Sequence, residues 1–377
     1  MPIKDRLVTW YISNIITPRR EIIDKPGFVV TTFTEDKYTT YLREFFLPEQ
    51  LFEIIENKIV EKYGEQGKQA LYSAGKKFGY MYSSMSNFPT INDITEKELA
   101  EFAYLMLRYI ESIYAKRAEH KLSFTEKILE ITFDNYIICR HNGFGYIMMN
   151  GAISGLWAYV LQDKSVEGTQ LECQGRNDKQ CYFFCAPVQK HPSETKKVFQ
   201  EQELFAQEFD NEYKAFNEIR DTKYAQNSLR HLIDLNFFNF QQGTLSYKGM
   251  RFFPCESHIL YFLENEIQKL PNGEQILCDA CTEYGKILQK TYGDTDYEQF
   301  IMDFFPALGF GELLFLDHNK PTIASIYYPW SKFSKKSKYI ILRAVLSGII
   351  SNALNKEIIF TNYDVDIVSY LTLTMYP

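Results

Sequence analysis

Apolar residues recur every three or four positions over the part of the chain that starts at Pro48. That spacing places them on one face of a helix. One stretch starts at Pro48, a second covers about residues 67–83, and a third follows Asn92-Asp93. We therefore predict three helices in this section, preceded by an N-terminal helical extension over residues 1–25.

The pattern changes after Ser123. The stretch ILEITFDNYIICR is rich in β-branched and aromatic residues, which predicts strands. A helix rich in small residues, MNGAISGLWAYVLQ, is expected next, and TQLECQG and KQCYFFCAP then indicate two strands around a turn. This order predicts an α+β fold in which a helix-rich section is followed by a small antiparallel sheet that ends in a β-hairpin.

Residues 191–230 are highly charged and yet periodic. Large apolar side chains recur there at helical spacing, at Phe205, Phe209, Tyr213, Phe216 and Ile219. We therefore predict an amphipathic connector helix over residues 191–230 rather than a flexible linker. Its polar face is acidic, which argues against binding to an anionic membrane surface.

The two halves of the chain carry similar motifs in the same order. REFFLPEQLFEIIENKI at 43–59 resembles RFFPCESHILYFLENEI at 251–267, LYSAGKKFGY at 71–80 resembles LCDACTEYGK at 277–286, and Ser154-Gly155 matches Ser347-Gly348. A repeated order of motifs is the mark of a duplicated unit. We infer two tandem homologous α+β domains, over residues 26–190 and 231–377.

Composition and charge narrow the class of protein. Apolar residues make up 45% and charged residues 24%, typical of a globular chain with a core, and the net charge of −7 provides no basic footprint for nucleic acid. The most apolar stretch, residues 340–354, contains Arg343, so we expect no transmembrane segment. Seven cysteines, an odd count, and the lack of a signal peptide indicate a cytoplasmic protein with free thiols.

Two cysteines face each other in the predicted terminal hairpin of the first half. If its turn is centred on G-R-N-D, Cys173 and Cys181 are directly opposed, with Cβ atoms ~5 Å apart. Two thiolates at that distance could share one zinc ion, with further ligands from Cys139, His141 or Glu167. The alternatives are a redox pair and two buried free thiols that pack as small hydrophobes.

Other catalytic patterns are missing from the sequence. Cys278 and Cys281 have the spacing of a redox or metal motif, but they lie in a predicted helix without a second pair, so we interpret them as core packing. The chain contains no P-loop, HExxH, GxSxG or GxGxxG motif, and we find no set of nucleophile, base and orienting residue. We therefore expect the protein not to be an enzyme.

One stretch of the first half, NGAISGLWAYVLQDKSVEGTQLECQGRNDKQCYFF, resembles the 4-vinyl reductase domain. The same fold occurs in the ligand-binding domains of phenol-sensing transcription activators and in transport-particle subunits of the Golgi. In the second half, GFGELLFLDHN and ASIYYPWS resemble the family's glycine-bearing strand and its strand ending in proline. The resemblance covers most of both halves and implies an α+β small-molecule-binding module that is often dimeric.

The resemblance also implies a metal. In the phenol sensors this hairpin contributes to a zinc site made of cysteines and a glutamate, and two of those positions match Cys173 and Cys181. The family's acidic ligand lies three residues before the first cysteine, where this chain has Gln170, and the family's upstream cysteine falls on Tyr146.

Together these features favour a sensor or regulatory protein that binds a small apolar or aromatic molecule and acts through a protein partner or as a homodimer. We predict pocket walls in the first domain at Phe78, Tyr82, Phe133, Tyr146 and Trp157; ordinary core packing of these rings is the alternative. A ligand-free interaction scaffold like the transport-particle subunits is the second hypothesis. A reductase acting on a vinyl group is a third, and it rests on the family name alone.

Overall fold

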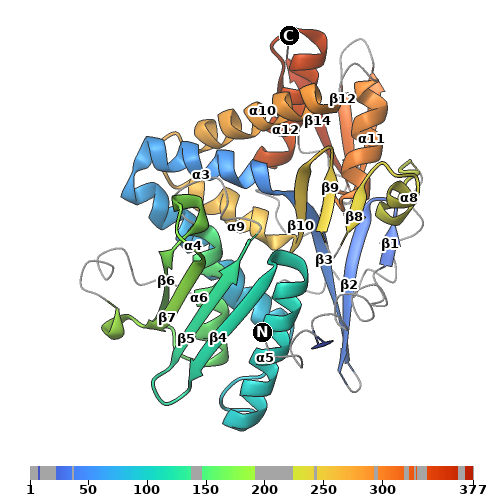
Figure 1. The fold of residues 1–377 in the computed structure, drawn as a ribbon. Coiled ribbons are helices and arrows are strands. Elements are labelled where there is room, and N and C mark those ends of the chain that lie inside the picture. The colour runs from blue at the N-terminus through green and yellow to red at the C-terminus, as the bar shows by residue number, and fades with distance from the viewer. Residues whose placement is uncertain are drawn as a thin grey trace. The chain divides into compact units, whose positions relative to one another are not determined.

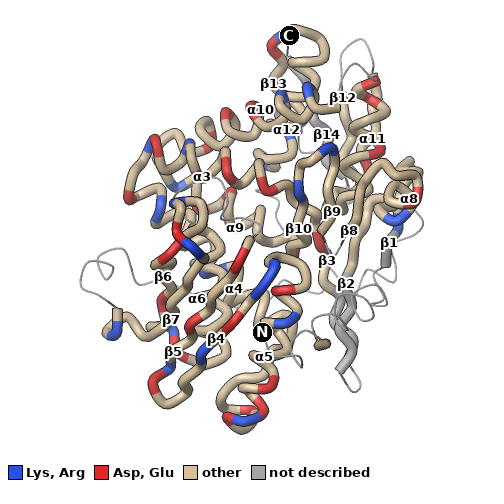
Figure 2. The backbone as a smooth tube through the Cα atoms, viewed as in Figure 1, with Lys and Arg blue, Asp and Glu red and all other residues tan. Residues whose placement is uncertain are grey.

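The computed structural model describes residues 7–8, 23–35, 38–136, 147–191, 224–241, 244–292, 296–317, 322–326, 328, 338–363 and 370–376. Over these residues the chain has an α+β fold in which helices accompany antiparallel sheets (Figure 1). Acidic and basic positions are interspersed along these elements (Figure 2). Most of the predicted N-terminal extension, residues 1–25, and of the predicted connector helix, residues 191–230, lies outside the described residues. No helix in the described part of the chain is both long enough and apolar enough to span a membrane.

The chain divides into two compact units. Unit 1 contains residues 1–20, 59–207 and 241–244, and unit 2 contains residues 21–58, 208–240 and 245–377. Residues 26–58, which were predicted to lie in the first domain, thus belong to unit 2 by their contacts. Helix α3 (Glu49–Tyr63) crosses the division between residues 58 and 59.

Unit 1 follows the order of elements expected for the first domain. These are α4 (Glu65–Met85), α5 (Glu96–Tyr114), β4 (Arg117–Ser123), β5 (Ile128–Asp134), α6 (Ile147–Val160), β6 (Val166–Glu172) and β7 (Cys181–Pro187), with short 3-10 turns at Gln174–Arg176 and Val188–Lys190. Helix α5 begins at a capping box, in which the Thr95 hydroxyl accepts from the Glu98 backbone and the Glu98 carboxylate accepts from Thr95 N. The four strands form an antiparallel sheet in the order β4-β5-β7-β6.

Glycines allow α4 and α6 to pack with their backbones in contact. A Cβ atom built on Gly79 would lie 1.9 Å from Ala152 O, and one on Gly155 would lie 2.0 Å from Lys76 O. No side chain larger than hydrogen fits at such distances. The GxxxG spacing on each helix therefore fixes where the two helices meet.

Unit 2 contains a second series of elements. It comprises α8 (Leu229–Asp234), α9 (His258–Ile267), α10 (Gly273–Tyr292), α11 (Tyr297–Ala307), β11 (Glu312–Asp317), β12 (Thr322–Ile326), α12 (Ile340–Leu354), β13 (Ile359–Tyr363) and β14 (Tyr370–Tyr376). The last four strands form an antiparallel sheet in the order β11-β12-β14-β13. Helix α12 is mostly apolar apart from Arg343, Ser347 and Ser351, which share one face, and its residues Ile340–Ser351 are all buried.

Unit 2 also holds a six-stranded antiparallel sheet in the order β1-β2-β3-β10-β9-β8. Its strands are β1 (Ile23–Lys25), β2 (Phe28–Glu35), β3 (Tyr38–Pro48), β8 (Asn239–Gln241), β9 (Thr244–Tyr247) and β10 (Met250–Glu256). The central pairing joins distant parts of the chain, because Phe46 of β3 is the partner of Pro254 of β10. This pairing explains why residues 21–58 belong to unit 2.

The two units share one order of elements. Helices α4 and α5 in unit 1, and α10 and α11 in unit 2, are followed by two strands, a glycine-bearing helix and two more strands. The strand order is also the same, because β11-β12-β14-β13 repeats β4-β5-β7-β6 position by position. Helices α10 and α12 meet through glycines as α4 and α6 do, with the Cβ position of Gly348 only 2.1 Å from Thr282 O.

Candidate functional site

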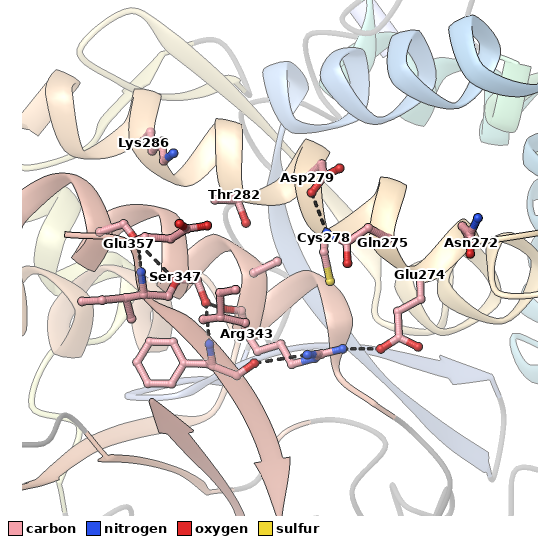
Figure 3. A pocket seen from close by; sticks show the side chains of 15 residues that line it. Asn272, Glu274, Gln275, Cys278, Asp279, Thr282, Lys286, Arg343, Ser347 and Glu357 are labelled. Carbon is pink, nitrogen blue, oxygen red and sulfur yellow. Dashed lines mark hydrogen bonds and ion pairs between the residues drawn. The ribbon is translucent and has the colours of Figure 1, made fainter. Parts of the chain in front are cut away.

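A cavity of about 500 Å³ lies in unit 2 beside α10, α12 and β13 (Figure 3). Its lining mixes charged, polar and apolar side chains: Asn272, Glu274, Gln275, Cys278, Asp279, Thr282, Lys286, Arg343, Ala344, Ser347, Ser351, Glu357, Ile358, Ile359 and Phe360. The volume falls in the range of small-molecule sites, about 300–1,000 Å³. We take this cavity as the candidate site.

Arg343 of α12 forms hydrogen bonds to α10, to β13 and to the backbone just before its own helix. Its Nη2 donates to Glu274 Oε1 of α10 at 2.5 Å, its Nη1 to Phe360 O of β13 at 3.1 Å, and its Nε to Lys338 O at 3.0 Å. Figure 3 shows Arg343 and Glu274 pointing toward one another along the cavity. Because the guanidinium is planar and charged, these contacts fix its orientation in the wall.

Two serines of α12 hold the edge strand against the helix. Ser347 Oγ accepts from Phe360 N at 2.9 Å and donates to Arg343 O at 2.7 Å. Ser351 Oγ accepts from Ile358 N at 2.9 Å. Because β13 is the last strand in its sheet, its outer backbone groups need partners, and these hydroxyls supply them.

The cavity is weakly acidic, because three carboxylates line it against two cations. Burial is the main cause that raises the pKa of the Cys278 thiol to about 11; Arg343 opposes this shift, while the carboxylates of Glu274, Glu264 and Asp279 add to it. The thiol is therefore neutral near pH 7, and it is a poor nucleophile.

Unit 1 has a buried polar cluster beside α4, α6 and β6. Lys76 Nζ lies 2.6 Å from Glu167 Oε1, and Tyr72 Oη donates to Glu167 Oε2 at 2.6 Å. Tyr72 Oη also lies 3.0 Å from Ser154 Oγ and accepts from Gly168 N at 2.9 Å. Burial raises the pKa of Glu167, although Lys76 and Tyr72 oppose that shift.

This cluster and the cavity occupy matching places in the two units. Gly155 contacts the carbonyl of Lys76, and Gly348 contacts the carbonyl of Thr282, so Lys76 and Thr282 hold equivalent positions on α4 and α10. Four residues before them, Tyr72 of α4 matches Cys278 of α10. Strand β6 supplies Glu167, whereas the matching strand β13, with the sequence IFTNY, has no acidic residue. In unit 1 the side chains of Tyr72 and Lys76 fill this place. In unit 2 the smaller Cys278 and Thr282 line a cavity there.

The cysteine hairpin of unit 1 has the strand register that places its two thiols near each other. Glu172 pairs with Tyr182, so Cys173 and Cys181 follow at the next position, and both are fully buried. Cys173 N donates to Asp178 Oδ2 at 2.8 Å, and Gln174 N lies 3.5 Å from Cys181 Sγ. The Asp178 side chain thus bonds to the backbone across the turn and stabilises the hairpin.

The zinc that the family resemblance implies is not supported by a ligand set among the described residues. They contain no group of three or more His, Cys, Asp or Glu placed to hold a metal ion. Glu167 is instead bonded to Lys76 and Tyr72, and Cys139 and His141 lie outside the described residues. Two thiols do not complete a four-ligand zinc site, so zinc at Cys173 and Cys181 stays a prediction.

The predicted pocket aromatics of unit 1 fall into three groups of rings. Phe78 and Tyr82 lie together on α4, with ring centroids 5.8 Å apart. Phe133 stacks on Tyr136 at 4.6 Å, and Trp157 lies 6.0 Å from Phe124. Tyr146 is outside the described residues. Described ring contacts do not join these groups around one site, and their role as pocket walls stays a prediction.

Sequence reasoning missed the lining of the cavity. From the sequence, Arg343 is only a charge that interrupts an apolar stretch, and Cys278 and Cys281 are interpreted as core. In the structure Cys281 is buried, whereas Cys278 is half-buried and lines the cavity. The signal was present in the repeat, because Tyr72 and Lys76 of the first half align with the smaller Cys278 and Thr282 of the second. Loss of side-chain volume at two adjacent turns of a core helix indicates a cavity.

Comparisons with known proteins found a weak match among solved structures alone. No family model and no curated protein matches the chain. Among solved structures, the phenol-responsive sensory domain of the transcription activator PoxR, crystallised with phenol, is similar with a TM-score of 0.35 and 12% identity, over 54% of this chain and 100% of that one. The geometry of this chain's own residues therefore carries the functional argument.

Proposed function

We propose that the protein is a regulatory protein that binds a small molecule in the cavity of unit 2 and acts through a partner, without catalysing a reaction. One observation carries the proposal: a cavity of about 500 Å³ lies where unit 1 has the buried cluster of Tyr72, Lys76 and Glu167. A cavity of this volume that one unit has and the other fills with side chains is a candidate for a small-molecule site.

The proposal treats the two units as copies of one module. Their common order of helices and strands and their matching glycine contacts support a duplication. After it, one copy kept a packed interior and the other acquired room for a ligand. The proposed ligand site thus lies in the second half of the chain, and pocket walls at the aromatic residues of the first half stay a separate prediction.

A ligand in this cavity would act on the arrangement of three elements. Arg343 bonds to α10 through Glu274 and to β13 through Phe360 O, and Ser347 and Ser351 join β13 to α12. A molecule that binds better to one arrangement of these elements shifts the population toward it. A partner that recognises that arrangement reads the presence of the ligand.

The chemistry of the lining favours binding over catalysis. Cys278 is its one thiol, and burial keeps the pKa of that thiol at about 11. Arg343 is held by three acceptors, so its role is to shape the wall. Among the described residues that line the cavity, we find no nucleophile with a neighbouring base and a residue that orients the base.

Native mass spectrometry of the purified full chain, followed by a thermal-shift screen of small metabolites, tests the proposal. Cys278→Tyr restores the residue of unit 1 and fills the cavity, so it should abolish ligand-induced shifts. Lys290→Tyr adds the same side chain on the exposed part of α10 and should leave them unchanged. If no compound shows a shift that Cys278→Tyr removes, the ligand-binding proposal is wrong and an interaction scaffold is favoured.

A further inference from the structure

We infer that the ligand of the unit 2 cavity is a small arylalkylamine, that is, a protonated amine joined by a short alkyl chain to an aromatic ring. This inference rests on the proposed function, and it adds the chemical class of the ligand. It comes from the side chains that occupy the matching place in unit 1 and from the charges that surround the cavity.

Unit 1 shows what this place in the fold accommodates. A phenol ring from Tyr72 and an alkylammonium group from Lys76 lie there one helical turn apart, and both end on the Glu167 carboxylate at 2.6 Å. The Lys76 and Glu167 side chains are only 2% and 7% exposed. A ring and an ammonium group are therefore packed side by side in the filled version of the site.

Unit 2 lacks both of these groups at the matching positions of α10, and the cavity lies beside those positions. Cys278 stands where Tyr72 does and Thr282 where Lys76 does, and both line the cavity. Replacing a phenol ring with a thiol and a butylammonium with a hydroxyl removes the atoms of one ring and one amine. A ligand that carries both fills the volume that the two substitutions removed, although unit 2 has no counterpart of the Glu167 carboxylate.

The charges of the lining select an amine over an acid. Glu274, Asp279 and Glu357 line the cavity, opposed by Arg343 and Lys286. Arg343 is already paired with Glu274 at 2.5 Å, so its charge is neutralised locally. A cation gains because two carboxylates, Asp279 and Glu357, remain against the single ammonium of Lys286, whereas an anion is repelled by more charges than attract it.

The apolar side of the lining accommodates the ring. Ala344, Ile358 and Phe360 line the cavity and are themselves buried to at least nine-tenths. A flat aromatic group against this wall removes apolar surface from water on both partners. The amine would then lie toward Asp279 or Glu357, whose side chains are exposed at the rim.

Isothermal titration calorimetry of the full chain with 2-phenylethylamine, 2-phenylethanol, phenylacetate and butylamine tests the inference. We expect 2-phenylethylamine to bind on the order of tenfold more tightly than the neutral alcohol, and the carboxylate and the ring-free amine more weakly still. The double variant Asp279→Asn, Glu357→Gln should remove the preference for the amine and leave binding of 2-phenylethanol unchanged. Because these two side chains are exposed, the variant should keep the wild-type circular dichroism spectrum and melting temperature.

Two results overturn the inference in distinguishable ways. If the alcohol or the carboxylate binds as tightly as the amine, and Cys278→Tyr abolishes that binding, the cavity is a ligand site and the amine class is wrong. If none of the four compounds binds and the wider screen finds nothing that Cys278→Tyr blocks, the proposed function fails as well. Thr282→Met fills the same cavity and replaces Cys278→Tyr as the blocking variant if the latter does not fold.

Discussion

Lys76 Nζ lies 2.6 Å from Glu167 Oε1 in the interior of unit 1, with both side chains almost fully buried. Removing one member of such a pair leaves the other as an uncompensated charge. We predict that Lys76→Met lowers the free energy of unfolding by about 3–5 kcal/mol, and that adding Glu167→Gln to it costs less than the sum of the single changes. Urea unfolding of the four proteins in this double-mutant cycle measures the coupling.

The exposed pair on the same helix is the control for that cycle. Lys68 Nζ also lies 2.6 Å from its partner, Glu65 Oε1, but the two side chains are 35% and 64% exposed. Lys68→Met should change the free energy of unfolding by less than about 1 kcal/mol, because solvent screens the pair. Equal losses from Lys76→Met and Lys68→Met would contradict the role assigned to burial.

Glu264 gives the stability of unit 2 a pH dependence. Its Oε1 accepts from Ile341 N at 2.9 Å at the start of α12, and burial raises the pKa of its carboxyl from 4.5 to about 7. The folded state holds the Glu264 proton more tightly than the unfolded state. The protonated carboxyl therefore stabilises the fold fully below pH 4.5, and this stabilisation is lost as the pH rises through about 7.

The variant Glu264→Gln tests this assignment, because the amide keeps an acceptor for Ile341 N and cannot ionise. We expect the melting temperature of the wild type, relative to that of the variant, to fall between pH 4.5 and about 7. Differential scanning calorimetry across this interval measures the difference. The same pH profile for both proteins would show that the pKa of Glu264 does not differ between the folded and unfolded states.

Much of the fold could be predicted from local patterns. The helical spacing after Pro48, after Gly67 and after Asn92 corresponds to α3, α4 and α5, and the two strands around G-R-N-D form the hairpin of β6 and β7. These elements depend on residues close together in the sequence, so periodicity and turn chemistry suffice to find them.

The central pairing of β3 with β10 could not be read in this way. Phe46 and Pro254 are partners although most of the chain separates them, and a periodic pattern does not identify the partner of a strand. The cavity was missed for a related reason. The cavity becomes apparent only when the small Cys278 of α10 is compared with the large Tyr72 at the matching position of α4. Neither residue is unusual for a core helix on its own.

The hydroxyls of Ser347 and Ser351 are predicted to hold the edge strand beside the cavity. Ser347→Ala and Ser351→Ala leave Phe360 N and Ile358 N, respectively, without their described acceptors. We expect each change to lower the free energy of unfolding by about 1–3 kcal/mol. Hydrogen exchange should speed up at Phe360 in the first variant and at Ile358 in the second, and exchange that is unchanged at both amides would refute the assignment.

Gly79 marks the point where α4 and α6 meet, and its substitution tests whether this close approach is needed. A Cβ at Gly79 would lie 1.9 Å from Ala152 O, which is backbone and cannot rotate away. We predict that Gly79→Ala lowers the free energy of unfolding by about 3 kcal/mol or more, because the helices must separate along their length. Gln66→Ala is the control, because Gln66 is exposed on the same helix and an exposed substitution usually changes the free energy of unfolding by less than about 0.5 kcal/mol. Urea unfolding compares the two variants, and a Gly79→Ala protein as stable as Gln66→Ala would mean that the helix pair tolerates a wider spacing than the contact implies.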